Sequence, residues 1–449
     1  MTAIHAKSAL LADGWRNDVR FEIAEGCFSR ITTGTEPEPD DDCRDVVIPA
    51  MPNLHSHAFQ RAMAGLAEIR GPSEDTFWSW RTVMYKFALN MMPDHVEAVA
   101  AQLYMEMLEA GFCRVGEFHY LHNDRDGTHY GNIAEMAERI AAASAETGIE
   151  LTLLPTFYAH SNFGGLPPLD GQRRFIHSPD SFSRVMENSA AIIAALPNAV
   201  LGIAPHSLRA VTAEELRTIL PLGGNGPIHI HAAEQTKEVE DCLAWSGARP
   251  VEWLVNNAAV DDRWCLIHAT HMTDMETNGV AESGAVAGLC PITEANLGDG
   301  IFPAPAFIER NGRFGIGSDS NIQISIAGEL RALEYAQRLS GRIRNVIAMP
   351  GGSTGRRLFD AALAGGHVAL GVKGGGLRVG ATANIVSLDK SATPYLLEDA
   401  VLDRWIFSDG VLVDAVWVAG RQQVSAGRHV RRDAITRRFK AAMADLLAR

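Results

Sequence analysis

Residues 45–57 read DVVIPAMPNLHSH, an apolar run that ends in two histidines one residue apart. Seven further short apolar runs follow, and most are separated from the next by a segment with helical spacing. They read CRVGEFHY (113–120), ELTLLPTFY (150–158), AVLGIAPHS (199–207), PIHIHAAE (227–234), WCLIHATH (264–271), AVAGLCPIT (285–293) and RFGIGSDS (313–320). Apolar strands that alternate with helices are typical of parallel strands covered by helices. The pattern predicts an α/β protein built on a (β/α)8 TIM barrel.

The two ends of the chain have a different pattern, of short strands separated by turns. LRVGATANIVSLD (377–389) and AVWVAGRQQVSAGRHV (415–430) are examples. We therefore expect a barrel over residues 49–375 and a small flanking β-sandwich domain, built from both termini, over residues 1–48 and 376–449. The insertion SNFGGLPPLDGQRRFIHSP (161–179) is interpreted either as a loop folded over a site or as an ordinary surface loop.

Composition argues against several classes of function. The chain has 449 residues and a formal net charge of −14, so we expect no nucleic-acid partner. The apolar stretches are too short to span a membrane, and the first residues lack the features of a signal peptide. The six cysteines are scattered without a CxxC pair, which is typical of free thiols. We expect a cytoplasmic protein without a membrane partner.

Polar side chains stand at the ends of the predicted barrel strands, where the active site of a (β/α)8 enzyme lies. His55 and His57 are two residues apart on a strand and therefore face the same way. His231 and Asp319 end two other strands. Three imidazoles and one carboxylate form a suitable ligand set for Zn²⁺, and Fe²⁺ accepts the same ligands. The fourth strand ends in PHSLR, without a lysine or glutamate to bridge two metals, so we expect one ion per subunit.

These motifs together resemble those of the amidohydrolase superfamily, in its mononuclear deaminase branch. The resemblance rests on HxH at 55–57, HxxE at 231–234, a histidine at 268 and SD at 318–319, and it covers nearly the whole chain. Asn384 departs from the pattern, because an aspartate is commoner there. NLHSHAFQRAMAGLAE, WSWR, EFHYLHN, PHSLRAV and HAAEQ more narrowly resemble the formimidoylglutamate deiminases of histidine degradation.

This resemblance implies hydrolysis of N-formimino-L-glutamate to N-formyl-L-glutamate and ammonia by a zinc-bound hydroxide. Asp319 would be both a ligand and the acceptor of the water's proton, and His268 would orient or polarise the water. Glu234 would carry a proton to the departing nitrogen. Each role has a structural alternative. Glu234 could be a carboxylate that stabilises a helix N-terminus. His268 could be a residue that supports another site residue, or a packed core histidine.

The implied substrate is a small amino-acid dianion, which a chain of net charge −14 repels unless cations are placed locally. Arg81 and Arg209 are the candidates, because a guanidinium matches a carboxylate with two parallel hydrogen bonds. Gln60, Tyr120 and His206 complete the predicted substrate site. The aromatic residues 77, 78 and 80 are interpreted as packing that positions Arg81, at the contact of an expected homodimer.

Two other functions stay open at this point. One is a deaminase or chlorohydrolase that acts on a heterocycle such as guanine or a triazine, which needs a flat apolar slot and fewer cationic groups. The other is a barrel without catalysis that serves as a binding module; such relatives typically lose metal ligands. The residues do not distinguish formiminoglutamate from formiminoaspartate, which is one methylene shorter.

Overall fold

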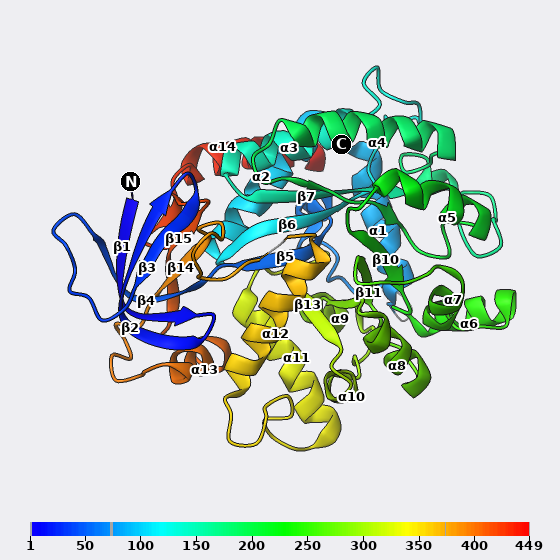
Figure 1. Ribbon diagram of the computed structural model, residues 1–449. Helices are drawn as coiled ribbons and strands as arrows, with labels where there is room; N and C mark the ends of the chain where they lie inside the picture. The colour runs from blue at the N-terminus through cyan, green and yellow to red at the C-terminus, as the bar shows by residue number, and fades with distance from the viewer. Residues whose placement is uncertain (1, 72–74, 373, 449) are drawn as a thin grey trace.

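A ring of parallel strands surrounded by helices forms the centre of the molecule (Figure 1). The computed structural model describes residues 2–71, 75–372 and 374–448. The barrel strands are β5 (Met51–Ser56), β6 (Phe112–His119), β7 (Glu150–Phe157), β8 (Val200–Leu201), β9 (Ala204–Pro205), β10 (Ile228–Ala232), β11 (Trp264–His268), β12 (Val286–Leu289) and β13 (Arg313–Ile316). Parallel bridges from Ser56 to Asp319 and from Ile203 to Ile228 join the two halves of the ring. The predicted barrel is confirmed, and its fourth strand is broken into β8 and β9.

Helices cover the outside of this ring and connect its strands. They are η1 (Ala58–Met63), α1 (Phe77–Asn90), α2 (Pro93–Glu109), α3 (Glu135–Thr147), η2 (Asp170–Gln172), α4 (Pro179–Ala194), α5 (Ala213–Ile219), η3 (Leu220–Gly223), α6 (Thr236–Ser246), α7 (Pro250–Asn257), α8 (Asp274–Ser283), α9 (Pro291–Leu297), α10 (Ala304–Glu309), α11 (Ile326–Gly341) and α12 (Thr354–Ala369). None of the described helices combines the length and the apolar character needed to cross a bilayer.

Helix α2 illustrates how local sequence sets these elements. Pro93 occupies the first helical position, where its missing N–H leaves no hydrogen bond unmade. Val96, Val99, Leu103 and other apolar residues at helical spacing are buried against the barrel. Gly111 follows the helix with φ = 95°, a conformation that glycine adopts without steric cost. A proline at the first position and a glycine just beyond the last turn therefore delimit the helix.

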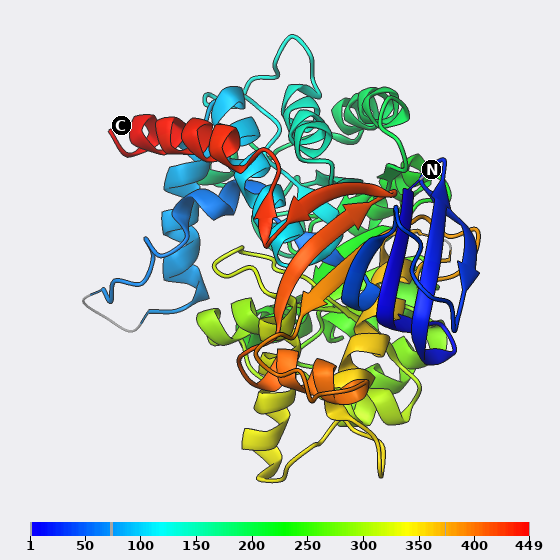
Figure 2. The ribbon, with the colours of Figure 1, turned by 90° about the vertical axis from the view of Figure 1, so that its left-hand side faces the viewer.

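Strands from both termini form one sheet beside the barrel (Figure 2). Its strands, in order across the sheet, are β17 (Arg428–His429), β16 (Arg421–Ser425), β15 (Leu412–Val418), β14 (Ile385–Asp389), β4 (Asp42–Pro49), β1 (Thr2–Leu11), β2 (Gly14–Ala24) and β3 (Cys27–Thr32). Apolar side chains from both halves, including Phe21, Ile385 and Trp417, pack into one core. Hydrogen bonding is continuous, so the predicted sandwich is a single sheet that encloses its own core.

One boundary is not visible in the pattern of the sequence. The run DVVIPAMPNLHSH is divided at Ala50: its first part belongs to β4 of the terminal sheet, and its second part is barrel strand β5.

The two helices near the C-terminus pack on the barrel. Helix α13 (Asp399–Phe407) packs on α11 and α12, while α14 (Arg432–Leu447) lies along α2. Ion pairs from His95 to Asp445 and from Arg438 to Glu97 hold α14 there. Both helices of the C-terminal segment therefore pack on the barrel.

Candidate active site

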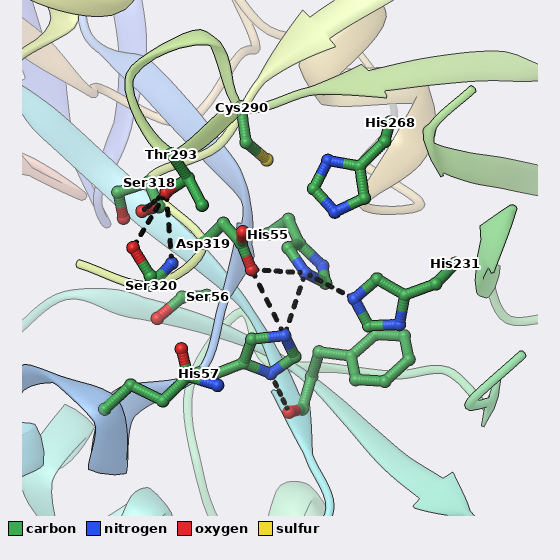
Figure 3. Close-up of polar contacts among 12 residues, drawn as sticks. His55, Ser56, His57, His231, His268, Cys290, Thr293, Ser318, Asp319 and Ser320 are labelled. Atoms are coloured by element: carbon green, nitrogen blue, oxygen red, sulfur yellow. Dashed lines mark hydrogen bonds and ion pairs between the residues drawn. The ribbon is translucent and has the colours of Figure 1, made fainter. Parts of the chain in front are cut away.

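Four side chains converge on one point at the carboxyl ends of the barrel strands (Figure 3). The Nε2 atoms of His55 and His57 are 3.1 Å apart, and Nε2 of His231 is 3.2 Å from that of His55. Oδ1 of Asp319 lies 3.2 Å from both His55 Nε2 and His57 Nε2. None of the four residues is more than 5% exposed. The structure thus brings together the four residues predicted as metal ligands, here called the metal group.

The spacing and orientation of these atoms fit a metal ion. Ligands bound tetrahedrally at ~2.0–2.2 Å stand roughly 3.3–3.6 Å apart, close to the observed 3.1–3.2 Å. Nδ1 of His57 is 3.0 Å from the Phe118 carbonyl, and Nδ1 of His231 is 3.0 Å from the His206 carbonyl. Because each Nδ1 donates its proton to a carbonyl, each Nε2 presents a lone pair to the centre. Neutral nitrogens that crowd one point need a cation between them.

Burial sets the protonation state that metal binding requires. It lowers the pKa of His55 to about 3 and the pKa of His231 well below its ordinary value, so both imidazoles are neutral at neutral pH. Burial alone would raise the pKa of Asp319, but the close contacts of its carboxylate with the rings of His55 and His57 hold that pKa well below its usual range. Neutral imidazole and ionised carboxylate are the forms that coordinate metals.

Backbone contacts between the first and last barrel strands hold the metal group together. Asp319 has a left-handed backbone with φ = 46°, and its N–H donates to the His55 carbonyl over 3.0 Å. The Asn321 side-chain amide donates to the carbonyls of His57 and Asp319, both at 3.0 Å. A Cβ on Gly317 would lie 2.8 Å from Cβ of His55, so only glycine permits this approach. Strain at Asp319 is therefore offset by specific hydrogen bonds.

A second group of side chains, Glu234, His268 and Glu294, lies beside the metal group. Oε1 of Glu234, just past β10, is 3.6 Å from Nε2 of His268 at the end of β11. Nδ1 of His268 is 3.2 Å from Oε1 of Glu294 in α9. Burial raises the pKa of Glu234. Burial would lower the pKa of His268, but the surrounding carboxylates raise it to about 10. This acid–base group can therefore hold and exchange protons close to the metal group.

One pocket connects both groups with the predicted substrate residues. It is lined by His57, Gln60, Phe77, Trp80, Arg81, Met84, Tyr85, Tyr120, Tyr158, Phe175, His206, Arg209, His231, Glu234, Leu297 and Asp319. Of the predicted site residues, only His55 and His268 are absent from this lining, and both are fully buried next to it. The sequence-based site is therefore one continuous place in the structure.

Several polar atoms around this pocket have no hydrogen-bond partner within the described part of the chain. They are Oε1 of Gln60, Nε of Arg209 and Nε2 of His268, all of them buried. Nε2 of Gln60 donates to the Tyr120 hydroxyl over 2.9 Å, which fixes the side-chain amide. Buried polar groups are normally hydrogen-bonded. Three unpaired atoms around a single pocket indicate a polar ligand.

The insertion at 161–179 contributes to the pocket, which favours the interpretation as a loop folded over a site. Its Phe175 lines the wall, and Nε2 of its Gln172 donates to the Tyr158 hydroxyl over 2.8 Å. Arg81 in α1 donates through Nε to the Tyr85 hydroxyl and through a terminal nitrogen to Tyr158 over 3.4 Å. The Arg81 guanidinium is thus held by neutral hydroxyls and keeps its full positive charge available to a ligand.

Two residues of the site, Glu294 and Tyr158, were not predicted from the sequence. They lie at the ends of the seventh and third predicted strands: Glu294 follows CPIT, and ELTLLPTFY ends in Tyr158. A search of every strand end and of the first turn beyond it would have found both. By contrast, His119 ends a strand but packs against His122, with ring centroids 5.1 Å apart, and does not line the pocket.

Two family models together match nearly the whole chain. Residues 46–422 match the model described as the amidohydrolase family. Residues 1–45 match the model described as the N-terminal domain of formimidoylglutamate deiminase HutF. The boundary between the two matches falls within β4, the terminal-sheet strand that directly precedes the barrel.

Individual relatives agree with these matches. A formimidoylglutamate deiminase from Pseudomonas aeruginosa is 49% identical over 454 residues, which cover 100% of both chains. The crystal structure of an amidohydrolase from Brucella melitensis has a TM-score of 0.98 at 58% identity, again over 100% of both chains. An adenosine deaminase from Xanthomonas campestris with bound zinc has a TM-score of 0.82 at 19% identity, covering 100% of this chain and 99% of that one. This last likeness is one of fold alone.

Proposed function

Because this chain belongs to the amidohydrolase family, we propose that it hydrolyses N-formimino-L-glutamate to N-formyl-L-glutamate and ammonia. Water adds to the formimino carbon, the bond from that carbon to the terminal nitrogen breaks, and the nitrogen leaves as ammonia. The full-length likeness to a formimidoylglutamate deiminase supports this substrate. The activity belongs to the degradation of histidine.

The observation that carries the proposal is the pair of guanidiniums in the pocket of the metal group. Arg81 and Arg209 both line this pocket, and Nε of Arg209 is buried without a partner in the described structure. Glu234 is the carboxylate paired with Arg209, and the nearest nitrogen–oxygen distance between them is long, at 3.8 Å. A substrate with two carboxylates supplies the missing negative charge, whereas a neutral heterocycle such as guanine offers no carboxylate to Arg81 and leaves Arg209 with its long ion pair to Glu234.

The proposed cofactor is one Zn²⁺ per subunit, held by His55, His57, His231 and Asp319. The donor set and its spacing support zinc, and Fe²⁺ takes the same ligands. When bound, such an ion supplies Lewis acidity, which lowers the pKa of water to about 7. An amidine carbon is a weak electrophile, so this chemistry is what the site needs from its metal.

The chain itself supplies the proton transfers and the substrate contacts. Asp319, besides its role as ligand, accepts one proton of the attacking water, and Glu234 accepts the other. Both protons pass to the terminal nitrogen of the substrate, the last step through Glu234, so that this nitrogen leaves as neutral ammonia. His268 presents Nε2 to the reacting oxygen. The substrate carboxylates pair with Arg81 and Arg209. Gln60, Tyr120 and His206 add hydrogen bonds to the same carboxylates.

Replacement of Glu294 by glutamine is expected to lower kcat by roughly 10–100-fold, the usual loss when the partner of a functional histidine is removed. The reason is that Glu294 fixes the ring of His268 through Nδ1. Steady-state kinetics should show KM nearly unchanged, because Glu294 does not line the pocket. Glu276→Gln is a matched control, since Glu276 is also a buried carboxylate in the first turn of a helix. An unchanged kcat for Glu294→Gln would show that Glu294 does not support the function of His268.

Ammonia release from N-formimino-L-glutamate and from guanine, measured side by side on zinc-loaded protein, tests the proposed function. We expect release from the first compound only. Turnover of guanine alone would reject the substrate and favour a heterocycle deaminase. Release from neither compound, by protein that holds stoichiometric metal, would favour the binding module.

We further propose that residues 49–375 form the catalytic domain and that residues 1–48 and 376–449 form the second domain. In this division, helices α13 and α14 return from the second domain to the catalytic one. The proposed assembly is a homodimer and the proposed location is the cytoplasm. The six free cysteines of the structure agree with a reducing compartment.

A further inference from the structure

A single aromatic side chain lies against both arginines of the pocket. Cζ of Arg81 is 5.4 Å from the ring centroid of Trp78, and Cζ of Arg209 is 5.8 Å from the same ring. Both distances are within the ~6 Å range of cation–π attraction, for which tryptophan is the best partner. Arg81 and Trp78 belong to α1, whereas Arg209 follows β9, so the ring connects two separate elements.

Trp78 contacts two side chains that carry the same charge. The guanidiniums of Arg81 and Arg209 carry like charges, and they converge on one pocket. The negative face of an indole attracts both cations without neutralising either, so their charge stays available to a ligand. Trp78 itself does not line the pocket. Because it contacts both guanidiniums without lining the pocket, Trp78 is a positioning residue and not a ligand-binding one.

Each arginine is held by different groups away from this ring. Arg81 donates to the hydroxyls of Tyr85 and Tyr158, and Tyr158 is in turn bound by Gln172. Arg209 is 5% exposed, and its ion pair with Glu234 is long, at 3.8 Å. The indole is a contact that both guanidiniums share, and it therefore relates the position of one to that of the other.

We propose that Trp78 determines specificity by fixing the separation of the Arg81 and Arg209 guanidiniums, so that the pocket selects a dicarboxylate with the chain length of glutamate. The inference rests on the proposed function, because it names what makes the same pocket prefer one N-formimino amino acid. With both anchors fixed, N-formimino-L-aspartate, which is one methylene shorter, cannot satisfy them and also place its formimino carbon beside Glu234.

Steady-state kinetics of Trp78→Leu and Trp78→Phe, with both N-formimino amino acids, test this proposal. We expect Trp78→Leu to raise KM for the glutamate substrate by roughly tenfold, because two guanidiniums that are no longer held by the indole must be ordered when the substrate binds. We expect kcat within about threefold of wild type, because the acid–base group is not touched. Trp78→Phe keeps an aromatic face and should lie between the two. The preference for glutamate over aspartate should fall several-fold in Trp78→Leu.

Binding of the product N-formyl-L-glutamate, measured by calorimetry, gives a readout that does not depend on turnover. It should weaken in Trp78→Leu in parallel with the rise in KM. Trp15→Leu is the matched control, because Trp15 is also half-buried but lies in the terminal sheet, where it donates to Asp399 over 2.7 Å. We expect the control to bind product and substrate like wild type.

The outcomes separate this proposal from the proposed function. A metal-loaded wild type that releases no ammonia from N-formimino-L-glutamate overturns the function. An active wild type, together with unchanged KM, product affinity and chain-length preference in Trp78→Leu, overturns the role of Trp78. If the leucine variant does not fold, Trp78→Phe is measured in its place. A wild-type KM together with a wild-type chain-length preference in Trp78→Phe also overturns the role of Trp78.

Discussion

Replacement of Glu234 by glutamine is expected to lower kcat by about 10²–10⁴-fold, the usual contribution of a positioned acid–base group, while the metal content stays at one ion per chain. Glutamine has the size of glutamate but cannot carry a proton. Oε1 of Glu234 is 3.6 Å from Nε2 of His268, and Glu234 is not part of the metal group. Kinetics together with metal analysis of the same preparation would measure both effects.

Glu215→Gln is a suitable control for this variant. Glu215 is a partly buried carboxylate that caps α5 and pairs with His160 over 2.9 Å, away from the pocket. The control should retain wild-type turnover. A fully metal-loaded Glu234→Gln protein with activity close to wild type would refute the proton-carrier role, and loss of metal would indicate that Glu234 is a ligand.

Replacement of His231 by alanine is expected to abolish both metal retention and turnover. His231 supplies one of three imidazole nitrogens, and its ring is oriented by a 3.0 Å hydrogen bond from Nδ1 to the His206 carbonyl. Loss of a ligand should cost more than the ~10–100-fold in affinity that loss of a ligand's hydrogen-bond partner costs. Equilibrium dialysis against zinc, followed by metal analysis, measures the effect directly.

His229 offers a control for this variant on the same strand. Its side chain is buried two residues earlier, and its Nε2 is 2.7 Å from the Ala369 carbonyl. His229→Gln should lower the melting temperature, because a buried hydrogen bond worth roughly 1 kcal/mol is disturbed, but it should retain the metal. If His231→Ala bound zinc as tightly as His229→Gln, His231 would not be a ligand.

The metal group was predictable because local rules specify it. Alternation along a strand places His55 and His57 on one face. Parallel strands end at one edge of the barrel, which brings His231 and Asp319 to the same place. These rules require only that each strand be recognised, and the apolar runs are strong enough for that.

Boundaries and contacts between distant segments were not predictable in this way. The second half of β4 and all of β5 are buried, so DVVIPAMPNLHSH shows no change in polarity where the terminal sheet is followed by the barrel. The contact between Trp78 and Arg209 depends on where α1 lies. That position is set by tertiary contacts, such as the hydrogen bond of 2.7 Å from buried Arg174 to the Met91 carbonyl beyond the helix. No periodicity in the sequence encodes such a contact.

We expect His55, His57, His231 and Asp319 together to hold one metal ion at the mouth of the barrel. Anomalous diffraction at the zinc edge, from crystals of the zinc-loaded protein, locates such an ion directly. We expect one strong peak per chain, with three Nε2 atoms and an Asp319 oxygen at ~2.0–2.2 Å. A peak elsewhere, two peaks at this site, or a peak from which His231 or Asp319 is out of bonding distance would contradict it.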